Sequence, residues 1–121
     1  MSKPERLKPE ILYLVVPCYN EEEVLPEPSQ QLRAKFMDLE QEGKIHPASR
    51  ILFVDDGSKD ATWELISGYH GAEPEYFSGI KLSRNEGHQN ALLAGLMTAK
   101  NKADMVVSMD ADLQDDINVL D

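Results

Sequence analysis

The chain carries Ile11-Leu12-Tyr13-Leu14-Val15-Val16 near its start, a run of apolar side chains with no charged residue between them. A strand with one wet face alternates apolar and polar residues, so an unbroken run is typical of a strand covered on both faces of a parallel sheet. Pro17 follows directly and is expected to end the strand, because proline has no backbone N–H to donate. The rest of the chain should therefore supply parallel neighbours for this strand and helices for its faces.

Three further stretches match strands of such a sheet. Residues 50–54, Arg-Ile-Leu-Phe-Val, repeat the apolar run and stop at Asp55-Asp56-Gly57-Ser58, where Gly and Ser mark a turn. Residues 105–109, Met-Val-Val-Ser-Met, end at Asp110. Residues 77–83 alternate in polarity and predict a strand that is less buried than the others.

Helical periodicity fills the gaps between these strands. Apolar residues recur at three- and four-residue spacing over residues 28–42, and this helix is expected to begin near Pro28, since proline fits only the first turn. A second helix is expected over residues 58–68, with Ser58 as its N-cap and its end near Gly68. A third, over residues 87–100, has small residues at four-residue spacing, which would let it lie close against a sheet. That stripe consists of Gly87, Ala91, Gly95 and Ala99.

Strands that alternate with helices predict an α/β fold with parallel pairing and right-handed crossovers. We expect a Rossmann-like, mostly parallel sheet with helices on both faces. The 121 residues and 41% hydrophobic content suit one core, so residues 1–121 are predicted to form a single domain. Ligands of such sheets bind outside the carboxyl ends of the strands, so the site is expected in the segments that follow the apolar runs.

Charge and cysteine content narrow the possible partners. The formal net charge of -10 disfavours unaided binding to nucleic acid or to an anionic membrane surface. Cys18 is the only cysteine, which predicts a buried or half-buried thiol in a reducing compartment, with a nucleophilic thiol as the lesser alternative. The chain shows no signal peptide and no apolar stretch of the roughly 18 residues that a membrane span needs. A cytoplasmic location is therefore expected.

The last strand end carries the strongest sign of a site. From Asp104 to Asp121 there are six acidic side chains and no basic one. Placing Asp110 and Asp112 in one loop with further acids brings like charges together unless a cation balances them. Carboxylate and amide oxygens select hard cations, so we expect Mg²⁺ or Mn²⁺ rather than zinc. The alternative is that short polar residues only begin turns and cap helices; it is weaker for this loop and stays open for residues 58–60.

The other strand ends suggest contacts to a nucleotide. A carboxylate of the Asp55-Asp56 pair could accept a hydrogen bond from the ring N–H of uracil or guanine. Tyr19 could flank the base or simply pack, and both interpretations stay open. Arg84 and Asn85 stand just before the third helix, whose positive N-terminus favours a diphosphate. For Arg84, a salt bridge to a nearby acid is the alternative.

Four motifs, in order over residues 10–116, resemble the inverting family 2 glycosyltransferases of GT-A fold. Each motif alone is weak, but the four in sequence are specific. The segment Gly87-His88-Gln89 and the last motif are most similar to the branch that acts on polyprenyl or dolichyl phosphate. The motifs are Pro17-Cys18-Tyr19-Asn20-Glu21; Val54-Asp55-Asp56-Gly57-Ser58 with Asp60 and Thr62; Arg84-Asn85-Glu86-Gly87 with Ala91 and Gly95; and Asp110-Ala111-Asp112-Leu113-Gln114-Asp115.

The resemblance implies transfer of a sugar, with inversion, from a nucleotide-diphosphate sugar to an acceptor such as polyprenyl phosphate, in the synthesis of cell-envelope or surface glycans. It implies that Asp112 and Gln114, with Asp110 nearer the ribose, hold a Mg²⁺ or Mn²⁺ ion that bridges the diphosphate. Arg84 and the metal would stabilise the departing nucleoside diphosphate. UDP is the default, since uracil is the commonest donor base in the family. Base and ribose are implied to lie among Pro17, Tyr19, Glu21, Val54 and Asp56, and the wider substrate-binding set adds Asn20, Arg84, Asn85, Asp110 and Ala111.

The chain departs from the family pattern in places. Asp116-Ile117 stands where the branch often has proline after the last motif aspartate, and Pro28 lies within a predicted helix. Because the chain stops at Asp121, we expect it to lack the acceptor-binding half, together with any catalytic base and any helices that attach the parent enzyme to the cytoplasmic face of a membrane. The fragment alone is expected to bind the donor weakly and to be inactive.

Three other classes remain as alternatives. A phosphoacceptor receiver domain shares the alternating order and an acidic pair, but its pair follows the first strand, whereas Asp55-Asp56 follow the second. A nucleotidyltransferase would have a Gly-rich loop with Arg or Lys after its first strand, and residues 17–21 have neither. The third is a non-catalytic nucleotide-sugar-binding relative, against which the intact metal-site residues argue.

Overall fold

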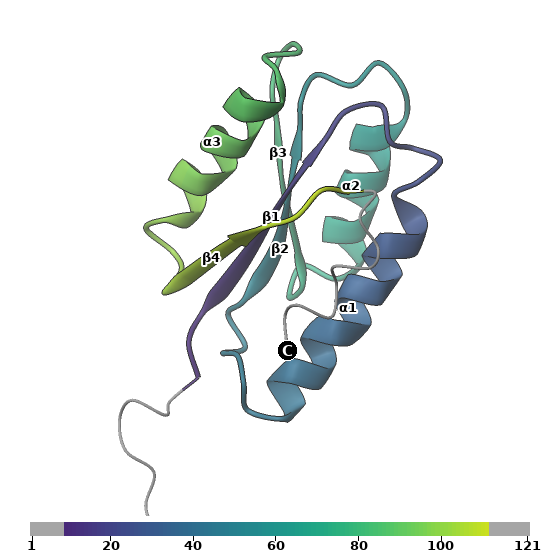
Figure 1. Cartoon of the computed structure of the whole chain (residues 1–121). Helices are drawn as coiled ribbons and strands as arrows, with labels where there is room; N and C mark the ends of the chain where they lie inside the picture. Colours follow the sequence, from purple (N-terminus) through teal and green to yellow (C-terminus); the bar gives the residue numbers. More distant parts are fainter. Residues whose placement is uncertain (1–8, 112–121) are drawn as a thin grey trace, which may run out of the picture.

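The computed structural model of the chain describes residues 9–111. Within this range the chain forms a four-stranded parallel sheet in the order β3-β2-β1-β4 (Figure 1). This arrangement confirms the predicted α/β, Rossmann-like class. The elements are β1 (Leu12–Cys18), α1 (Pro26–Gln41), β2 (Arg50–Asp55), α2 (Thr62–Ala72), β3 (Phe77–Lys81), α3 (His88–Ala99) and β4 (Met105–Ser108).

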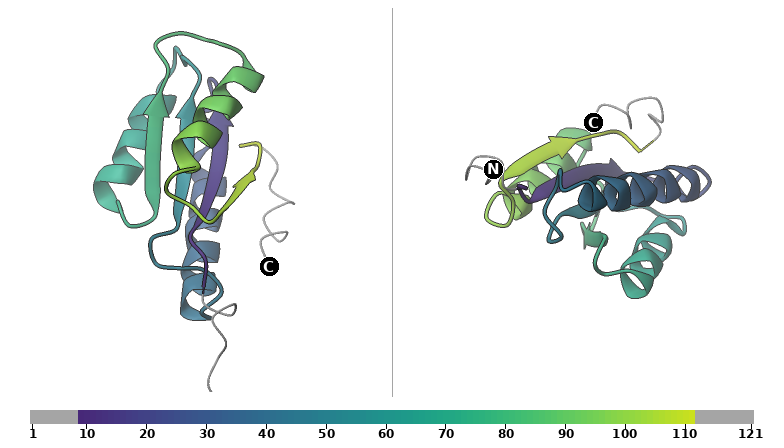
Figure 2. Two further views of the ribbon diagram at one scale, coloured as in Figure 1. Left: turned by 90° about the vertical axis from the view of Figure 1, so that its left-hand side faces the viewer. Right: turned by 90° about the horizontal axis from the view of Figure 1, so that it is seen from below.

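Helices cover both faces of the sheet, as predicted (Figures 1 and 2). On one face α1 and α2 pack over Leu14, Val16 and Phe53. On the other face α3 packs over Val15 and Leu52. The middle of β1 is therefore closed to solvent from both sides, which explains why its sequence does not alternate. None of the helices in the described range is long and apolar enough to cross a membrane.

The strand β1 continues past Pro17, so the expectation that this proline ends the strand is wrong. The reason is the direction in which the missing N–H would point. The carbonyl of Val15 accepts a hydrogen bond from Met109 on the β4 side, and in a parallel strand Pro17 points to the same side. The pairing with β4 ends where Ser108 meets Val15, so the proline stands beyond the last paired residue of that neighbour and interrupts no ladder.

The helix α1 begins at Pro26, two residues before the predicted start. Pro28 also lies in the first turn, where the backbone N–H groups have no partner within a helix, so neither proline removes a hydrogen bond. The predicted apolar face is confirmed, because Leu32, Phe36 and Leu39 are all buried. Pro28 is thus compatible with the helix, although the sequence made it look misplaced.

The helix α2 spans Thr62–Ala72, and two predictions about it are wrong. Ser58 does not cap it, because the helix begins four residues later and the Ser58 hydroxyl bonds the loop after β1. The helix also continues through Gly68 instead of ending there. Directly after that glycine, Tyr69 packs its ring on Phe77 with 5.3 Å between the centroids. This packing offsets the roughly 1 kcal/mol that a glycine costs inside a helix.

The helix α3 lies against the sheet through its small residues, as predicted. Ala91, Gly95 and Ala99 are its buried positions. A Cβ atom at Gly95 would lie 2.4 Å from a methyl carbon of Val15 and 2.9 Å from a methyl carbon of Val54. The close approach of α3 to β1 and β2 therefore requires glycine at this position.

Replacing Gly95 by alanine should destabilise the chain, although alanine is the better helix former. The added methyl group must displace two valine side chains of the core, which should lower the free energy of unfolding by about 1 to 3 kcal/mol. Gly68 provides the matched control, since a Cβ there meets nothing within 4 Å. Gly68→Ala should raise the free energy of unfolding by about 0.5 to 1 kcal/mol. Urea unfolding measures both, and stabilisation by both substitutions would contradict the close packing of α3.

Candidate functional site

The carboxyl ends of β1 and β4, the loop after β2 and the start of α3 enclose a cleft of about 350 Å³. It lies at the edge of the sheet where the sequence places the site. Most of the residues predicted to bind a donor line it. Tyr19 is 40% exposed, so this aromatic residue is accessible to a ligand. The predicted residues that line the cleft are Pro17, Tyr19, Glu21, Asp56, Asn85, Asp110 and Ala111.

Three predicted residues lie outside the cleft lining. Val54 is fully buried in the sheet, beneath Gly95 of α3. Arg84 lines a second hollow beside the cleft. Its guanidinium Nε lies 2.8 Å from a carboxylate oxygen of Glu86, and its side chain is 81% exposed. The salt bridge that the sequence left open for Arg84 is therefore present. The third residue, Asn20, belongs to a network of hydrogen bonds between two loops.

This network ties the loop after β1 to the loop after β2. The backbone N–H of Asn20 donates to the Ser58 hydroxyl, and the Asn20 side-chain carbonyl accepts from the backbone N–H of Lys59, both at 2.8 Å. The backbone N–H of Glu21 donates to the Thr62 hydroxyl, also at 2.8 Å. Asn20 has a φ of 52°, a left-handed conformation that asparagine tolerates better than most residues. These bonds fix the loop that presents Tyr19 and Glu21 to the cleft.

Asp60 holds the start of α2. Its carboxylate accepts hydrogen bonds from the Thr62 hydroxyl at 2.6 Å and from the Thr62 backbone N–H at 2.9 Å. It also accepts one from the Glu22 backbone N–H at 3.2 Å. Burial acts to raise the pKa of Asp60, but these bonds outweigh it and lower the pKa below its usual value. The stability that this carboxylate contributes is therefore present at neutral pH and is lost as the pH falls through the lowered pKa.

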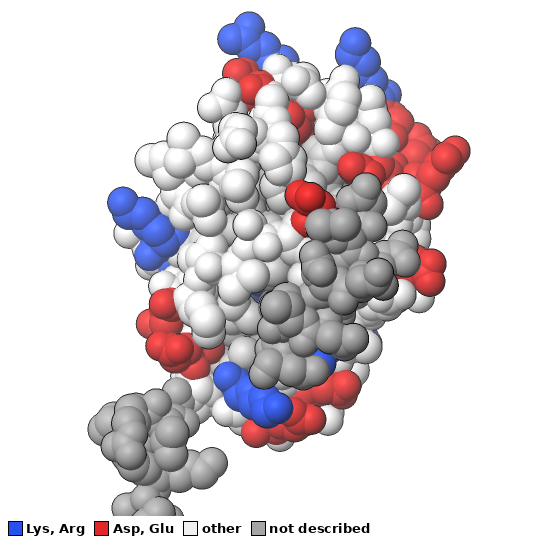
Figure 3. Space-filling view, in the orientation of Figure 1, with Lys and Arg blue, Asp and Glu red and all other residues white. Residues whose placement is uncertain are grey.

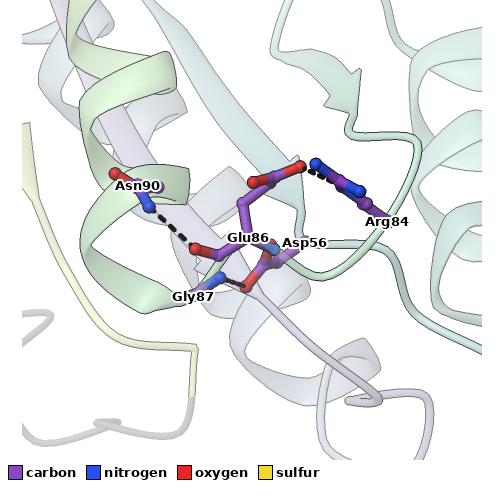
Figure 4. A network of polar contacts seen from close by, with 5 residues as sticks. All are labelled: Asp56, Arg84, Glu86, Gly87 and Asn90. Carbon is purple, nitrogen blue, oxygen red and sulfur yellow. Dashed lines mark hydrogen bonds and ion pairs between the residues drawn. The ribbon is translucent and has the colours of Figure 1, made fainter.

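Asp56 is buried and joins the sheet to the start of α3 (Figure 4). Its Oδ1 accepts a hydrogen bond from the Glu86 backbone N–H at 2.7 Å, and its Oδ2 accepts one from the Gly87 backbone N–H at 3.1 Å. Gly87 has a φ of 97°, a conformation that favours glycine. From the first turn of α3, the Asn90 side-chain amide donates to the Glu86 carbonyl at 2.8 Å. Asp56 thus positions the segment that forms one wall of the cleft.

Cys18 borders the cleft, but its side chain is only 2% exposed. Burial raises the pKa of its thiol far above the usual value, and the nearby carboxylates of Glu21 and Asp55 raise it further. A thiol that stays protonated is a poor nucleophile. The predicted buried thiol is confirmed, and the alternative of a nucleophilic Cys18 is not supported.

Asp110 and His88 face each other at the cleft. The Nε2 of His88 lies 3.5 Å from Oδ1 of Asp110, and both side chains are more than half exposed. The Asp110 carboxylate is a hard oxygen ligand of the kind that Mg²⁺ and Mn²⁺ prefer. Within residues 9–111, however, no three His, Cys, Asp or Glu side chains are grouped closely enough to hold an ion. Asp112 and Gln114 lie outside the described residues, so the metal site stays a prediction.

Sequence reasoning assigned no role in the cleft to four of its lining residues, namely Cys18, Gly87, His88 and Ala91. A signal for them existed in the small-residue stripe of α3. A helix that lies close to the sheet and begins directly after a strand end brings its first turn to the same edge as the strand-end loops. The spacing of Gly87 and Ala91 that predicts close packing of α3 therefore also places His88 at the cleft.

Comparison with known sequences identifies relatives of this chain. The family model described as glycosyl transferase family 2 matches residues 13–121. The uncharacterized glycosyltransferase YkoT of Bacillus subtilis is 56% identical over 110 residues, which cover 91% of this chain and 32% of YkoT. The undecaprenyl-phosphate 4-deoxy-4-formamido-L-arabinose transferase of Aeromonas hydrophila is 36% identical over 104 residues, covering 86% of this chain and 29% of the relative. The chain thus spans about a third of the length of these relatives.

Solved structures share the fold. TarS of S. aureus in complex with UDP matches 84% of this chain and 27% of its own, with a TM-score of 0.64 and 22% identity. The mannosyltransferase PcManGT of Pyrobaculum calidifontis, in complex with GDP-Man and Mn²⁺, matches 86% of this chain and 28% of its own, with a TM-score of 0.65 and 23% identity. These likenesses confirm the GT-A type of α/β fold.

Asp56→Asn should loosen the start of α3. The asparagine amide has one oxygen, so its NH₂ group must face one of the two backbone N–H groups that Asp56 now accepts. We expect a loss of about 1 to 3 kcal/mol in the free energy of unfolding, the usual cost of a buried unpaired donor. Hydrogen exchange of the Glu86 and Gly87 amides, followed by NMR, should become faster.

Glu86→Gln is the control for this substitution. It removes the ion pair with Arg84, which is exposed and should contribute less than about 1 kcal/mol. The backbone bonds to Asp56 remain in that variant, so the amide exchange of Gly87 should stay slow. Equal exchange rates and equal stability in the two variants would show that Asp56 does not position this loop.

Proposed function

The chain belongs to glycosyltransferase family 2, and on that premise we propose that it is the donor-binding part of an enzyme that transfers a sugar from a nucleotide-diphosphate sugar to an acceptor. The observation that carries the proposal is the composition of the cleft. Four segments far apart in the sequence contribute to it, and each contains a residue that the family resemblance assigns to the donor. They are represented by Tyr19, Asp56, Asn85 and Asp110.

The nucleoside is proposed to bind where Tyr19 and Asn85 line the cleft. Tyr19 offers an aromatic face to the base, and the Asn85 amide can both donate and accept hydrogen bonds. Asp55 is fully buried, so the carboxylate that could accept from a base N–H is that of Asp56. Each Asp56 oxygen receives one backbone N–H and keeps a second acceptor site, so the loop contact and a base contact are compatible.

The diphosphate is proposed to lie at the other end of the cleft, near Asp110 and the start of α3. The first turn of a helix presents backbone N–H groups and a positive dipole end, which favour an anion. Asp110, Asp112 and Gln114 would hold Mg²⁺ or Mn²⁺, and the bound cation would supply positive charge to the departing nucleoside diphosphate. In this chain of net charge -10, a cation at the carboxylates is what makes an acidic cleft acceptable to a diphosphate.

The proposal extends to donor and acceptor classes. A relative is named for undecaprenyl phosphate, which supports a polyprenyl phosphate as acceptor and a place for the parent enzyme at the cytoplasmic face of a membrane. Structural neighbours are complexes with UDP and with GDP-Man. We take a UDP-sugar as the donor and inversion at the anomeric carbon as the outcome. The acceptor site then belongs to the part of the relatives that this chain does not span.

Calorimetric titration of the chain with UDP, GDP and UDP-glucose, each with and without Mn²⁺, tests donor binding. UDP and UDP-glucose should bind in the presence of Mn²⁺, and removing the metal should weaken binding by about tenfold or more, equivalent to about 1.4 kcal/mol. Asp110→Ala and Asp112→Ala should each have a similar effect. Asp38→Ala is the control, because this aspartate is exposed on α1 and outside the cleft. Binding that ignores the metal and survives both cleft substitutions would contradict the proposed site.

A further inference from the structure

A second hollow, of about 520 Å³, lies beside the cleft and over the ends of β2 and β3. It shares Tyr19 and Asn85 with the cleft but has neither His88 nor Asp110 in its lining. Since the sheet order is β3-β2-β1-β4, the hollow occupies the β3 side of the strand-end edge and Asp110 occupies the β4 side. The hollow is therefore separate from the place proposed for the donor diphosphate. Arg84, which the family resemblance assigns to the diphosphate, lines this hollow and not the cleft.

The charge of this hollow is opposite to that of the chain as a whole. Its lining includes Lys59 from the loop after β2, together with Lys81 and Arg84 from the end of β3 and the loop that follows it, and no Asp or Glu. Figure 3 shows basic side chains at the upper edge of the molecule, where Figure 1 places the loops after β2 and β3. In a chain with 22 acidic and 12 basic side chains, three cations around one hollow need an explanation.

Two of the three cations lack a carboxylate partner within the described residues. The ammonium group of Lys81 lies over the ring of Trp63, 6.0 Å from its centroid, and no ion pair involves Lys81 or Lys59 there. Arg84 is paired with Glu86 but is 81% exposed, so it keeps free N–H donors. Lys59 and Lys81 therefore have no carboxylate partner among the described residues, and the N–H groups of Arg84 other than the Nε–H that bonds Glu86 are available to an anion.

The backbone of the hollow is held in place by close packing. A Cβ atom at Gly57 would lie 2.3 Å from the carbonyl carbon of Arg84 and 2.4 Å from the nitrogen of Asn85, so the two loops touch backbone to backbone. Gly57 also has a φ of 72°, which favours glycine. In the described part of the chain, the backbone N–H groups of Ser83, Arg84 and Asn85 have no protein acceptor. A fixed frame with free N–H donors suits a phosphate oxygen.

We propose that this hollow is a second anion site, which binds a phosphate group through Lys59, Lys81 and Arg84 and is distinct from the donor diphosphate site. Phosphate matches the lining because it presents several acceptor oxygens and a double negative charge to converging cations. The phosphate group is carried either by a soluble molecule or by a lipid headgroup. Phosphate binding here depends on the basic side chains of the hollow and on the close contact of its two loops, and it is independent of a donor bound in the cleft.

Binding of pyrophosphate and of inorganic phosphate to the whole chain, measured by calorimetry at low ionic strength without divalent metal, tests the site. Both anions should bind, and the double variant Lys59→Gln with Lys81→Gln should weaken binding by about tenfold or more, as expected for the loss of two charge-assisted bonds. The variant Lys59→Arg with Lys81→Arg keeps the charges and should retain binding within about threefold. Lys100→Gln with Lys102→Gln removes the same charge from lysines outside the hollow and should leave binding unchanged.

A second arm identifies the carrier of the phosphate. Sedimentation with phosphatidic acid vesicles, against phosphatidylcholine vesicles, should pull down the unsubstituted chain and not the Lys-to-Gln double variant if the carrier is a lipid. Binding to soluble phosphates alone assigns a soluble carrier. The proposal is overturned if neither anion nor vesicle binds, or if the Lys59 and Lys81 double variant binds as well as the Lys100 and Lys102 control.

Discussion

The burial of β1 on both faces is the constraint from which the rest of the structure follows. A strand with solvent on neither side needs a helix layer on each face and a hydrogen-bonded neighbour on each edge, and this chain supplies both. The layer on one face is tight, because α3 reaches Val15 and Val54 only where Gly95 has no side chain. The depth of α3 then decides where its first turn stands, and that turn forms a wall of the cleft. A packing requirement in the core thus sets the shape of the candidate site.

Hydrogen bonds between the strand-end loops hold the walls of the cleft in place. Parallel strands bring four segments to one edge, but only specific bonds hold them there. Asp56 fastens the segment before α3, and the bonds of Asn20 and Glu21 fasten the loop after β1 to the loop after β2. Several polar residues that match the family motifs therefore serve the frame of the cleft as well as, or instead of, the ligand. Motif residues in such a site carry structural and binding roles together.

The sequence predicted the sheet, its helical layers and the edge that carries the cleft, because these depend on patterns repeated over many residues. It failed where one contact decides the outcome. Pro17 continues a strand because of the side to which its missing N–H points. Ser58 does not cap α2, because the helix begins at Thr62 and the Ser58 hydroxyl bonds the backbone of Asn20 instead. Val54 carries a motif position yet lies in the core beneath Gly95, which residue type alone could not reveal. Such hydrogen bonds and such close packing join segments that are far apart in the sequence, so no local sequence pattern predicts them.

The distribution of charge along the strand-end edge connects the two proposed sites. The β4 side carries Asp110, whereas the β3 side carries Lys59, Lys81 and Arg84. On the β4 side a carboxylate repels an anion unless a bound cation balances it, but on the β3 side basic side chains can hold an anion directly. Tyr19 and Asn85 line both spaces and so stand at the boundary between them. Binding of an anion at the proposed β4-side site would depend on a bound metal, whereas binding at the proposed β3-side site would not. Metal dependence is therefore the physical property that distinguishes the two sites.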